Sequence, residues 1–317
     1  MTRFGAVSIA LSLAFLIGPT WSAGTEPFVV DELHDGVWLF RAPDHQATHT
    51  NSLVVDRETG LLVVDSQPSP AAARQLLQAI AEISSKPVTY LLLTHAHVES
   101  TGGASAFPDS TLLIASMVTH LALADEERDL AGETRLRTAD PDSWKAPPRV
   151  RPDLVITSGT RLMDGERIVE LLPLHGGHYP GSLILRLENV GLYYVGSAVV
   201  TDRNPFADVA HSDLRAWITS LNSLSVLRPE LVVPSRGKPI DAETLRRFRD
   251  SLTWVVGQIE NAFIEGIDTD KVIDFAMDSP ELQEYFDLET DPSFVSTLFE
   301  TAFKDSAAQR GKRNLKP

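Results

Sequence analysis

Short apolar segments separated by turn residues fill two stretches of the chain. In the first stretch, residues 28–65, the segments FVVDEL, GVWLF, NSLVVD and LLVVD are divided by polar groups that include Asp35-Gly36 and RETG. An Asp-Gly pair between apolar runs is a strong hairpin signal, so this stretch is predicted to form a β-meander. The second stretch, from LVITSG to LYYVG, follows residue 153 and has the same character. The chain is therefore expected to contain two successive sets of strands.

Helical patterns accompany each set of strands. PSPAAARQLLQAIAEI has Ser69 as a candidate N-cap and Pro70 at the first helical position. VTYLLLT (88–94) is too apolar to alternate, which predicts a strand covered on both faces. Further helices are expected over about 116–134, over 212–227 with Ser212 as N-cap, and, with breaks at Gly266, Pro280 and Pro292, over about 241–304.

The order of these elements predicts the fold class. Strands and helices, followed by strands and helices again, suggest two sheets packed together with helices outside. This is a four-layer αββα sandwich of the α+β class, with a C-terminal helical extension. We place the sandwich at residues 27–240, the helical extension at 241–305 and a basic flexible tail at 306–317.

The N-terminus has the pattern of a secretory signal. Arg3 precedes an apolar segment over 4–17 that is short for a bilayer span, and the small residues at 22–24 suit signal-peptidase cleavage. We predict a signal peptide over residues 1–23, with no stable membrane insertion after cleavage; an uncleaved anchor is the alternative. The chain has no cysteine. Disulfides and thiolate ligands are thereby excluded, which fits a periplasmic or secreted bacterial protein.

The formal net charge of −15 bears on the partner. A field of that sign repels a phosphate backbone, and the only basic cluster is the tail RGKRNLK. Nucleic acid is therefore not an expected partner, and a small-molecule substrate is.

The segment LLLTHAHVESTGG (91–103) carries the candidate chemistry. Two histidines, His95 and His97, directly follow a buried strand, and a turn there would favour the Gly-Gly pair. Imidazoles are common Zn²⁺ ligands, and three of them with a water make a catalytic site that has an open position. His178 in the loop HGGHYPGS is our candidate for the third ligand, with His175 as the nearby alternative.

Over roughly residues 27–240 the chain resembles the metallo-β-lactamase-fold superfamily of metallohydrolases. The family pattern is T-H-x-H-x-D-H-x-G-G, then G-H-T-x-G, G-D and P-G-H-G. Here the matching segments are T-H-A-H-V-E-S-T-G-G, G-H-Y-P-G-S, G-S and P-S-R-G. Asp65 matches the early buried aspartate that braces the histidine loop in the family. The signal and the helical tail are similar to those of a periplasmic subgroup.

The resemblance implies one metal ion per chain. The family's three-histidine metal position is matched by His95, His97 and His178, whereas its second metal position is degenerate. The four ligands of that second position are replaced by Glu99, Ser100, Ser197 and Arg236. Serine hydroxyls are poor Zn²⁺ ligands and arginine is none. The expected cofactor is therefore a single Zn²⁺.

The expected activity is hydrolysis, by attack of a zinc-bound hydroxide on an ester, thioester or amide-type bond. Glu99 would orient that water or accept its proton. Arg236 would replace the lost positive charge and anchor an anionic group of the substrate. The alternative is that Glu99 and Arg236 pair and close the site, which would leave a non-catalytic periplasmic binding or accessory protein.

Two other histidines are not expected to bind the metal. His120 lies within a helical pattern beside apolar residues, which is typical of a packed or surface histidine. His211 precedes a helix and is expected to face solvent, in a loop that could border the cleft.

Overall fold

The computed structural model describes residues 28–41, 50–126, 146–174, 176–201, 207, 209–267, 269–277, 279–280, 286 and 292–314. The predicted signal peptide and His175 lie outside these residues. Within them, no helix is both long enough and apolar enough to cross a membrane.

The first sheet has seven strands in the order β1-β2-β3-β4-β5-β6-β7. The strands are β1 (Val29–His34), β2 (Val37–Arg41), β3 (Ser52–Arg57), β4 (Gly60–Val64), β5 (Val88–Leu92), β6 (Leu112–Ser116) and β7 (Leu154–Ile156). Strands β1 to β4 pair antiparallel, which confirms the predicted meander, and β4 to β7 pair parallel. The change from antiparallel to parallel pairing follows from α1 (Pro70–Ile83), the helix that joins β4 to β5.

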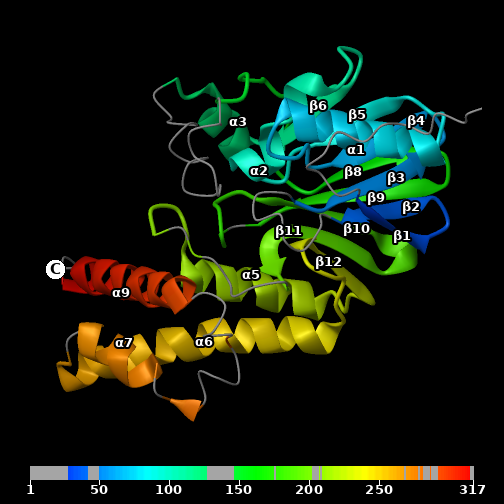
Figure 1. The fold of residues 1–317 in the computed structure, drawn as a ribbon. Helices are drawn as coiled ribbons and strands as arrows, with labels where there is room; N and C mark the ends of the chain where they lie inside the picture. Colours follow the sequence, from blue (N-terminus) through cyan, green and yellow to red (C-terminus); the bar gives the residue numbers. More distant parts are fainter. Residues whose placement is uncertain are drawn as a thin grey trace, which may run out of the picture.

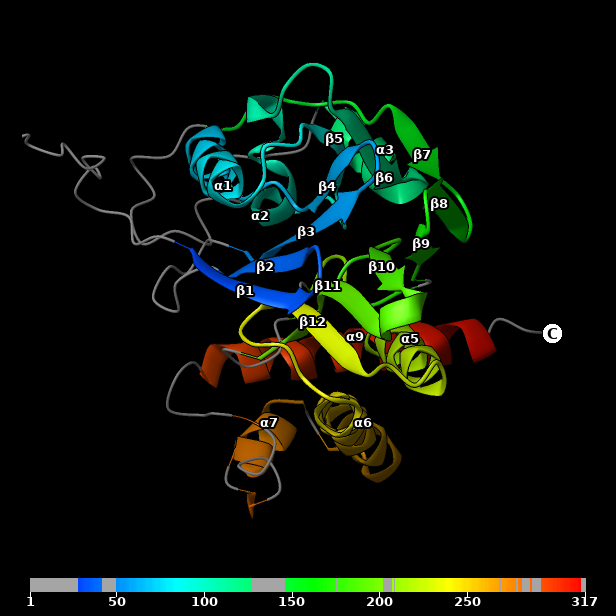
Figure 2. The same ribbon diagram turned by 90° about the vertical axis from the view of Figure 1, so that its right-hand side faces the viewer.

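The second sheet has five strands in the order β12-β11-β10-β9-β8. They are β8 (Thr160–Asp164), β9 (Arg167–Pro173), β10 (Leu183–Leu187), β11 (Leu192–Val200) and β12 (Leu231–Arg236). Strands β8 to β11 pair antiparallel, and β12 pairs parallel to β11 after a helical crossover through α5 (Leu214–Val226). The two sheets lie face to face between helices (Figures 1 and 2).

The helices cover the outer faces of the sheets. On the first sheet these are α1 (Pro70–Ile83), α2 (Val98–Thr101) and α3 (Met117–Ala124), and on the second α5 (Leu214–Val226), α6 (Ala242–Glu265), α7 (Thr269–Met277) and α9 (Pro292–Asn314). Figure 2 shows α5 and α9 nearer the sheet and α6 and α7 beyond them. The predicted four-layer α+β sandwich with C-terminal helices is therefore confirmed.

Helix ends agree in part with the expected caps. Ser69 accepts a hydrogen bond from the Ala72 amide at 3.2 Å and caps α1, with Pro70 at the first position as predicted. The N-cap of α5 is Asp213, which accepts from the Ala216 amide, so the expectation of Ser212 was wrong by one residue. Ser212 instead donates to the carbonyl of His178. α3 ends at Ala124, earlier than the predicted end near residue 134.

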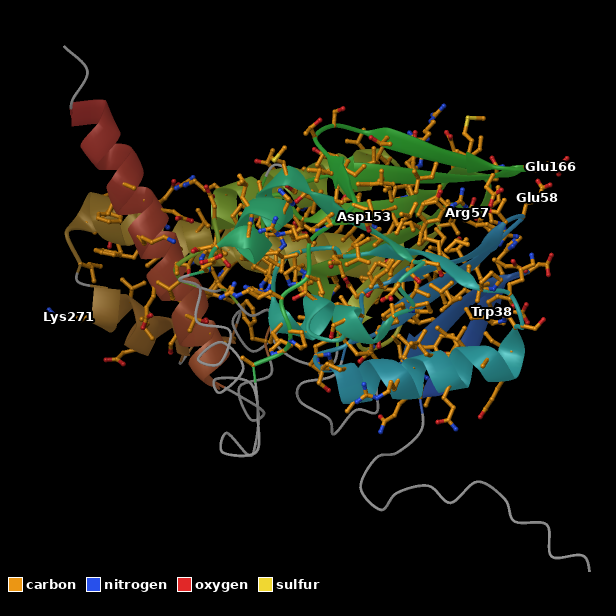
Figure 3. The ribbon with its side chains drawn as sticks, turned by 90° about the horizontal axis from the view of Figure 1, so that it is seen from above. Trp38, Arg57, Glu58, Asp153, Glu166 and Lys271 are labelled. Atoms are coloured by element: carbon orange, nitrogen blue, oxygen red, sulfur yellow. The ribbon has the colours of Figure 1, made fainter. Side chains whose placement is uncertain are left out.

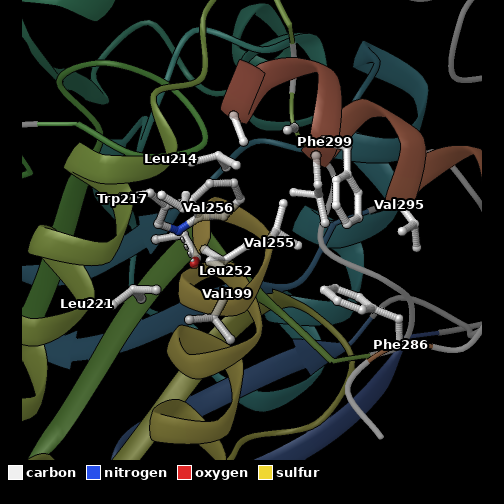
Figure 4. Close-up of a cluster of buried hydrophobic side chains, with 14 of the residues drawn as sticks. Val199, Leu214, Trp217, Leu221, Leu252, Val255, Val256, Phe286, Val295 and Phe299 are labelled. Atoms are coloured by element: carbon white, nitrogen blue, oxygen red, sulfur yellow. Dashed lines mark hydrogen bonds between the residues drawn. The ribbon is translucent and has the colours of Figure 1, made fainter. Parts of the chain in front are cut away.

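Strand alternation sends side chains into two different cores. Leu53 and Val55 of β3 pack in the cluster between the sheets, whereas Val54 packs in the cluster under α1. All three are fully buried, as expected for a strand covered on both faces. The third core joins the second sheet to the C-terminal helices, and Figure 4 shows Trp217 of α5 beside Val255 of α6 and Phe299 of α9.

Candidate metal centre

The first two histidines lie where β5, in the parallel part of the first sheet, ends. Leu93 continues the strand direction and donates to the carbonyl of Ile114 at 2.8 Å. His97 is the N-cap residue of α2, with extended φ and ψ of −61° and 150°. The chain therefore turns sharply after Thr94, and both imidazoles are only 1% exposed. Ligand sites form at such carboxyl ends of parallel strands.

The Gly-Gly pair after α2 is required by close packing rather than by a left-handed turn. Gly102 and Gly103 have ordinary φ values of −65° and −88°. A Cβ at Gly102 would overlap the carbonyl of Pro68, and a Cβ at Gly103 would overlap the carbonyl of Ser66. The glycines thus let α2 press against the segment that follows β4, and the expected turn explanation was wrong.

His178 comes from the loop between β9 and β10, in the second sheet. A hydrogen bond joins this loop to the first histidine loop: the Leu183 amide donates to the carbonyl of Thr94 at 2.7 Å. Ser182 donates to the carbonyl of Tyr179 at 2.9 Å and tightens the turn after His178. The side chain of His178 is buried, with 5% of the residue exposed.

Four side chains converge where the two loops meet. One nitrogen each of His95, His97 and His178 and one oxygen of Glu99 all lie within 4.8 Å of one another. His178 Nε2 is 3.1 Å from His97 Nδ1. The Glu99 oxygen Oε1 lies 3.5 Å from His97 Nδ1 and 3.6 Å from His95 Nε2. This group of three imidazoles and one carboxylate can bind a metal ion.

Three of the separations between these atoms are close to those around a tetrahedral ion, and the group as a whole lies within 4.8 Å. Ligand bonds of ~2.0–2.1 Å to a tetrahedral Zn²⁺ place the ligand atoms about 3.4 Å from one another. The separations of 3.1, 3.5 and 3.6 Å scatter around that value. The donor set is also suitable, because imidazole and carboxylate are the zinc ligands that remain in a chain without cysteine.

Hydroxyl groups orient His95 toward the centre. Its Nδ1 lies 3.0 Å from Thr94 Oγ1 and 3.2 Å from Ser100 Oγ. The Thr94 hydroxyl donates to Asp65 at 2.9 Å, so its oxygen is left to accept from the Nδ1–H of His95. That tautomer directs the Nε2 lone pair to the metal site. Ser100, which replaces a metal-binding histidine of the family, thus contacts the ring of a neighbouring histidine.

Asp65 holds Thr94 in the position from which it contacts His95. It is fully buried with a positive φ of 64°, and its carboxyl group also accepts a bond from the Thr94 amide at 2.9 Å and from the Tyr194 hydroxyl at 3.2 Å. Burial raises the pKa of Asp65 to about 7, against the opposing effect of the Thr94 and Tyr194 hydrogen bonds. Burial and the nearby Asp65 raise the pKa of Tyr194 well above its usual value. The brace predicted for Asp65 therefore acts through Thr94.

Two of the four positions of the second metal site, Ser197 and Arg236, lie on β11 and β12, whereas Glu99 and Ser100 lie on α2. Ser197 and Ser235 face each other across these strands, with their hydroxyl oxygens 3.0 Å apart. Arg236 ends β12 with a half-buried side chain, and its carbonyl accepts from the Thr201 amide at 3.1 Å. Its predicted action on the substrate stays a prediction.

Two aromatic contacts at the site were not foreseen. The Tyr179 ring lies 4.7 Å from the His97 ring and 5.2 Å from the His211 ring, measured between centroids. Tyr179 is buried and His211 is exposed, so the pair runs from the metal group to the surface. A signal was present in HGGHYPGS, where an aromatic residue directly follows the ligand candidate. His120 lies on α3, outside the metal-binding group.

The chain belongs to the metallo-beta-lactamase superfamily. The sequence profile of that superfamily matches residues 45–236, which is more than half of the chain. The match includes His95, His97, Glu99, His178 and Arg236, and it ends before α6.

Curated relatives differ in their named activities. A metallo-beta-lactamase type 2 from Bacillus sp. is 25% identical over 229 residues, covering 70% of this chain and 81% of that protein. A linear primary-alkylsulfatase from Pseudomonas sp. is 24% identical over 276 residues, covering 73% of this chain and 51% of that protein. The chain thus spans about half the length of the alkylsulfatase.

Solved structures support the fold. A metallo-beta-lactamase from Pontibacter korlensis has a TM-score of 0.57 at 20% identity, covering 69% of this chain and 95% of that one. A stereoselective inverting sec-alkylsulfatase from Pseudomonas sp. has a TM-score of 0.67 at 15% identity, covering 87% of this chain and 50% of that one. Residues 1–240 are about three-quarters of the chain, so the second match must extend into the C-terminal helices.

Proposed function

We propose that the protein is an exported hydrolase that uses one Zn²⁺ ion per chain to cleave an ester, thioester or amide-type bond. The observation that carries this proposal is the convergence of three imidazole nitrogens within 4.8 Å of one another, with an oxygen of Glu99 beside them. The degenerate second position, with Ser100, Ser197 and Arg236, supports one ion rather than two.

In this proposal His95, His97 and His178 hold the ion through Nε2, Nδ1 and Nε2. A bound Zn²⁺ would there supply a water of lowered pKa, about 7, and would polarise a substrate carbonyl. Glu99 then acts as the general base, because its oxygen lies beside two of the three ligand nitrogens and can accept a proton there. Arg236, at the end of β12, anchors an anionic group of the substrate.

The named activities of the relatives suggest which substrates to test. They include metallo-beta-lactamases, a linear primary-alkylsulfatase and the alpha subunit of a 2,4-dinitroanisole O-demethylase from Nocardioides sp.. An anionic substrate is consistent with Arg236 and with the alkylsulfatase relatives. We therefore propose a panel of carboxylate-bearing esters, thioesters, lactams and primary alkyl sulfates.

A second candidate function follows from the position of Glu99. If Glu99 Oε1 is the fourth ligand, the ion has no open position and the site is structural. The protein would then be a periplasmic binding or accessory protein. The separations of 3.5 and 3.6 Å to His97 and His95 are those of a fourth ligand as well as of a nearby base.

The first test is metal content per chain, measured by elemental analysis on periplasm-purified protein and on His178→Ala. About one zinc per chain, lost in the variant, supports the metal site, and turnover of any panel substrate then supports the hydrolase. One zinc that is retained with no turnover, and a cobalt-substituted spectrum typical of four protein ligands, supports the binding protein. No metal in the folded protein contradicts the hydrolase and favours the binding or accessory protein. The purified protein also tests export, since loss of residues 1–23 is the mass change expected after cleavage.

A further inference from the structure

The C-terminal helix α9 contacts the segment that leads into α5. Lys304 Nζ donates to the carbonyl of Val209 and, at 3.2 Å, to the carbonyl of Ser212. The neighbouring Asp305 accepts a hydrogen bond of 2.9 Å from the Leu214 amide. Leu214 lies in the first turn of α5, and amides in the first turn of a helix have no hydrogen-bond acceptor within the helix. Two adjacent residues of α9 thus fix the backbone on both sides of the α5 N-cap.

The α5 segment in turn holds the loop that carries His178. Three successive carbonyls of that loop accept hydrogen bonds from it. The Gly176 carbonyl accepts from Ser220 at 2.8 Å, the Gly177 carbonyl from the Asp213 amide at 3.3 Å, and the His178 carbonyl from Ser212 at 2.8 Å. The backbone of the predicted third ligand is therefore positioned by α5 and the residue before its N-cap.

The His178 loop is closed by hydrogen bonds from Ser182 to the Tyr179 carbonyl and from the Leu174 amide to the Ser182 carbonyl, and Gly176 and Gly177 join its N-terminal half to α5. It contains Gly177 and Gly181 with φ values of 156° and 67°, a region that glycine adopts freely. The Gly176 backbone lies so close to α5 that a Cβ there would overlap the Cβ of Ala216. A shift of α5 along its axis would therefore displace His178, because three hydrogen bonds join the carbonyls of residues 176–178 to α5 and to the two residues before it.

From these contacts we propose that Lys304 and Asp305 of α9 are positioning residues for the metal site. They act through Ser212 and the start of α5, and they keep His178 close enough to His95 and His97 for the three imidazoles to bind one ion. Packing supports the same path, because Leu214 of α5 and Phe299 of α9 are fully buried in one cluster (Figure 4). α9 lies outside the residues matched by the superfamily profile, so this role belongs to the helical extension of this chain. The inference rests on the proposed metal site.

The charge of Lys304 is informative. A cation near a helix N-terminus is disfavoured by the helix dipole, whereas Asp305 is favoured there. Lys304 is 43% exposed at its side chain and could extend into water. Its ammonium group instead reaches two carbonyls that precede α5, so its contribution is to fix the path of residues 209–212 rather than to favour the helix.

The test is zinc affinity by chelator competition, performed on the full chain well below its unfolding temperature. Ser212→Ala, Lys304→Met and Asp305→Ala are each expected to weaken zinc binding about tenfold, the lower end of what loss of an outer-shell partner costs. Lys304→Arg and Asp305→Asn keep a donor and an acceptor, and they are expected to restore most of the affinity.

Lys86→Met is the matched control. Lys86 also donates to a backbone carbonyl, that of Arg57, and pairs with Asp56. Figure 3 shows Arg57 at the end of the sandwich away from Lys271 of the helical extension. The control variant is expected to bind zinc as the unchanged protein does.

Two results overturn the proposal in different ways. If the unchanged protein binds zinc and Lys304→Met and Asp305→Ala bind it equally well, α9 only stabilises the fold and the metal site stands. If the unchanged protein binds no zinc, the metal site and the positioning role fail together. Hydrogen exchange of residues 176–183 in the metal-free protein gives a second readout. It is expected to be faster in Lys304→Met than in Lys86→Met, and equal exchange in the two variants counts against the proposal.

Discussion

Replacing Gly103 by alanine tests the claim that close packing, rather than a special backbone conformation, requires the Gly-Gly pair. The φ and ψ of Gly103 are −88° and −7°, at the edge of the right-handed helical region and on the side of negative φ that alanine also adopts. The added Cβ would overlap the carbonyl of Ser66 and lie 2.6 Å from the Cβ of Ala73. Neither atom can rotate away, so either α2 or the segment after β4 must shift.

Overpacking of a core by one methyl group costs typically ~1–3 kcal/mol. Because a backbone oxygen is the overlapped atom at Gly103, we expect the upper end, about 3 kcal/mol of unfolding free energy. At about 2 °C per kcal/mol for a chain of this size, the unfolding temperature falls by about 6 °C. Either shift changes the packing of α2, whose N-cap is His97, against the segment after β4. Zinc affinity is therefore expected to fall together with stability.

Urea unfolding in the presence of a chelator measures the free energy, and Gly257→Ala is the control. Gly257 lies within α6, and no atom comes within 4 Å of the position that a Cβ would take there. Alanine at this position is expected to stabilise the protein by about 1 kcal/mol, because glycine is a poor helix former. If Gly103→Ala is as stable as the unchanged protein, or gains stability as Gly257→Ala does, the packing explanation is wrong.

Three further predictions concern the site and its support. Burial raises the pKa of Asp65 to about 7 from 3.8, so the folded protein holds a proton that the unfolded chain releases between these values. The free energy of unfolding that this group contributes is complete below about pH 4 and is lost as the pH rises through 7, by up to about 4 kcal/mol. Urea midpoints measured with a chelator present should therefore fall with rising pH in the unchanged protein, and this fall should be absent in Asp65→Asn. Glu99→Gln should lower kcat by about 100-fold or more on any substrate that is found, while the metal content stays near one ion per chain. Loss of the metal in this variant would instead indicate that Glu99 is a metal ligand. Trp217→Phe removes the bond from Nε1 to the carbonyl of Ala198, which is 2.9 Å long, and calorimetry should show a loss of about 1–2 kcal/mol.

The sequence carried enough local information to predict the layers of the fold. Alternating and continuous apolar runs, the Asp35-Gly36 turn and the Ser69-Pro70 helix start are signals within a few residues of chain, and the structure contains each of them. The order of the strands in each sheet was not predicted. The parallel β4–β5 pairing agrees with the rule that a helical crossover joins parallel strands. The N-cap of α5 was misplaced because Ser212 and Asp213 are equally good caps. The choice between them depends on the distant carbonyl of His178.

The site was predictable in its ligand candidates but not in its supports. His95, His97 and Glu99 lie together because one strand end and one turn bring them together, and that is visible in thirteen residues of sequence. The contacts of Tyr179 with His211, and of Lys304 with the start of α5, join segments that are far apart in the chain. No local pattern in the sequence points to such pairs.

The hydrogen bond from the Leu183 amide to the Thr94 carbonyl has a consequence for assembly of the molecule. It ties the loop that offers two imidazoles to the loop that offers the third, and these loops belong to different sheets. Neither sheet alone can therefore form the ion-binding group. Metal binding would therefore require that the two sheets have packed together, and the bound metal would stabilise them against separation. Unfolding that begins by parting the sheets would release the ion first, so metal loss under mild denaturant would precede loss of secondary structure.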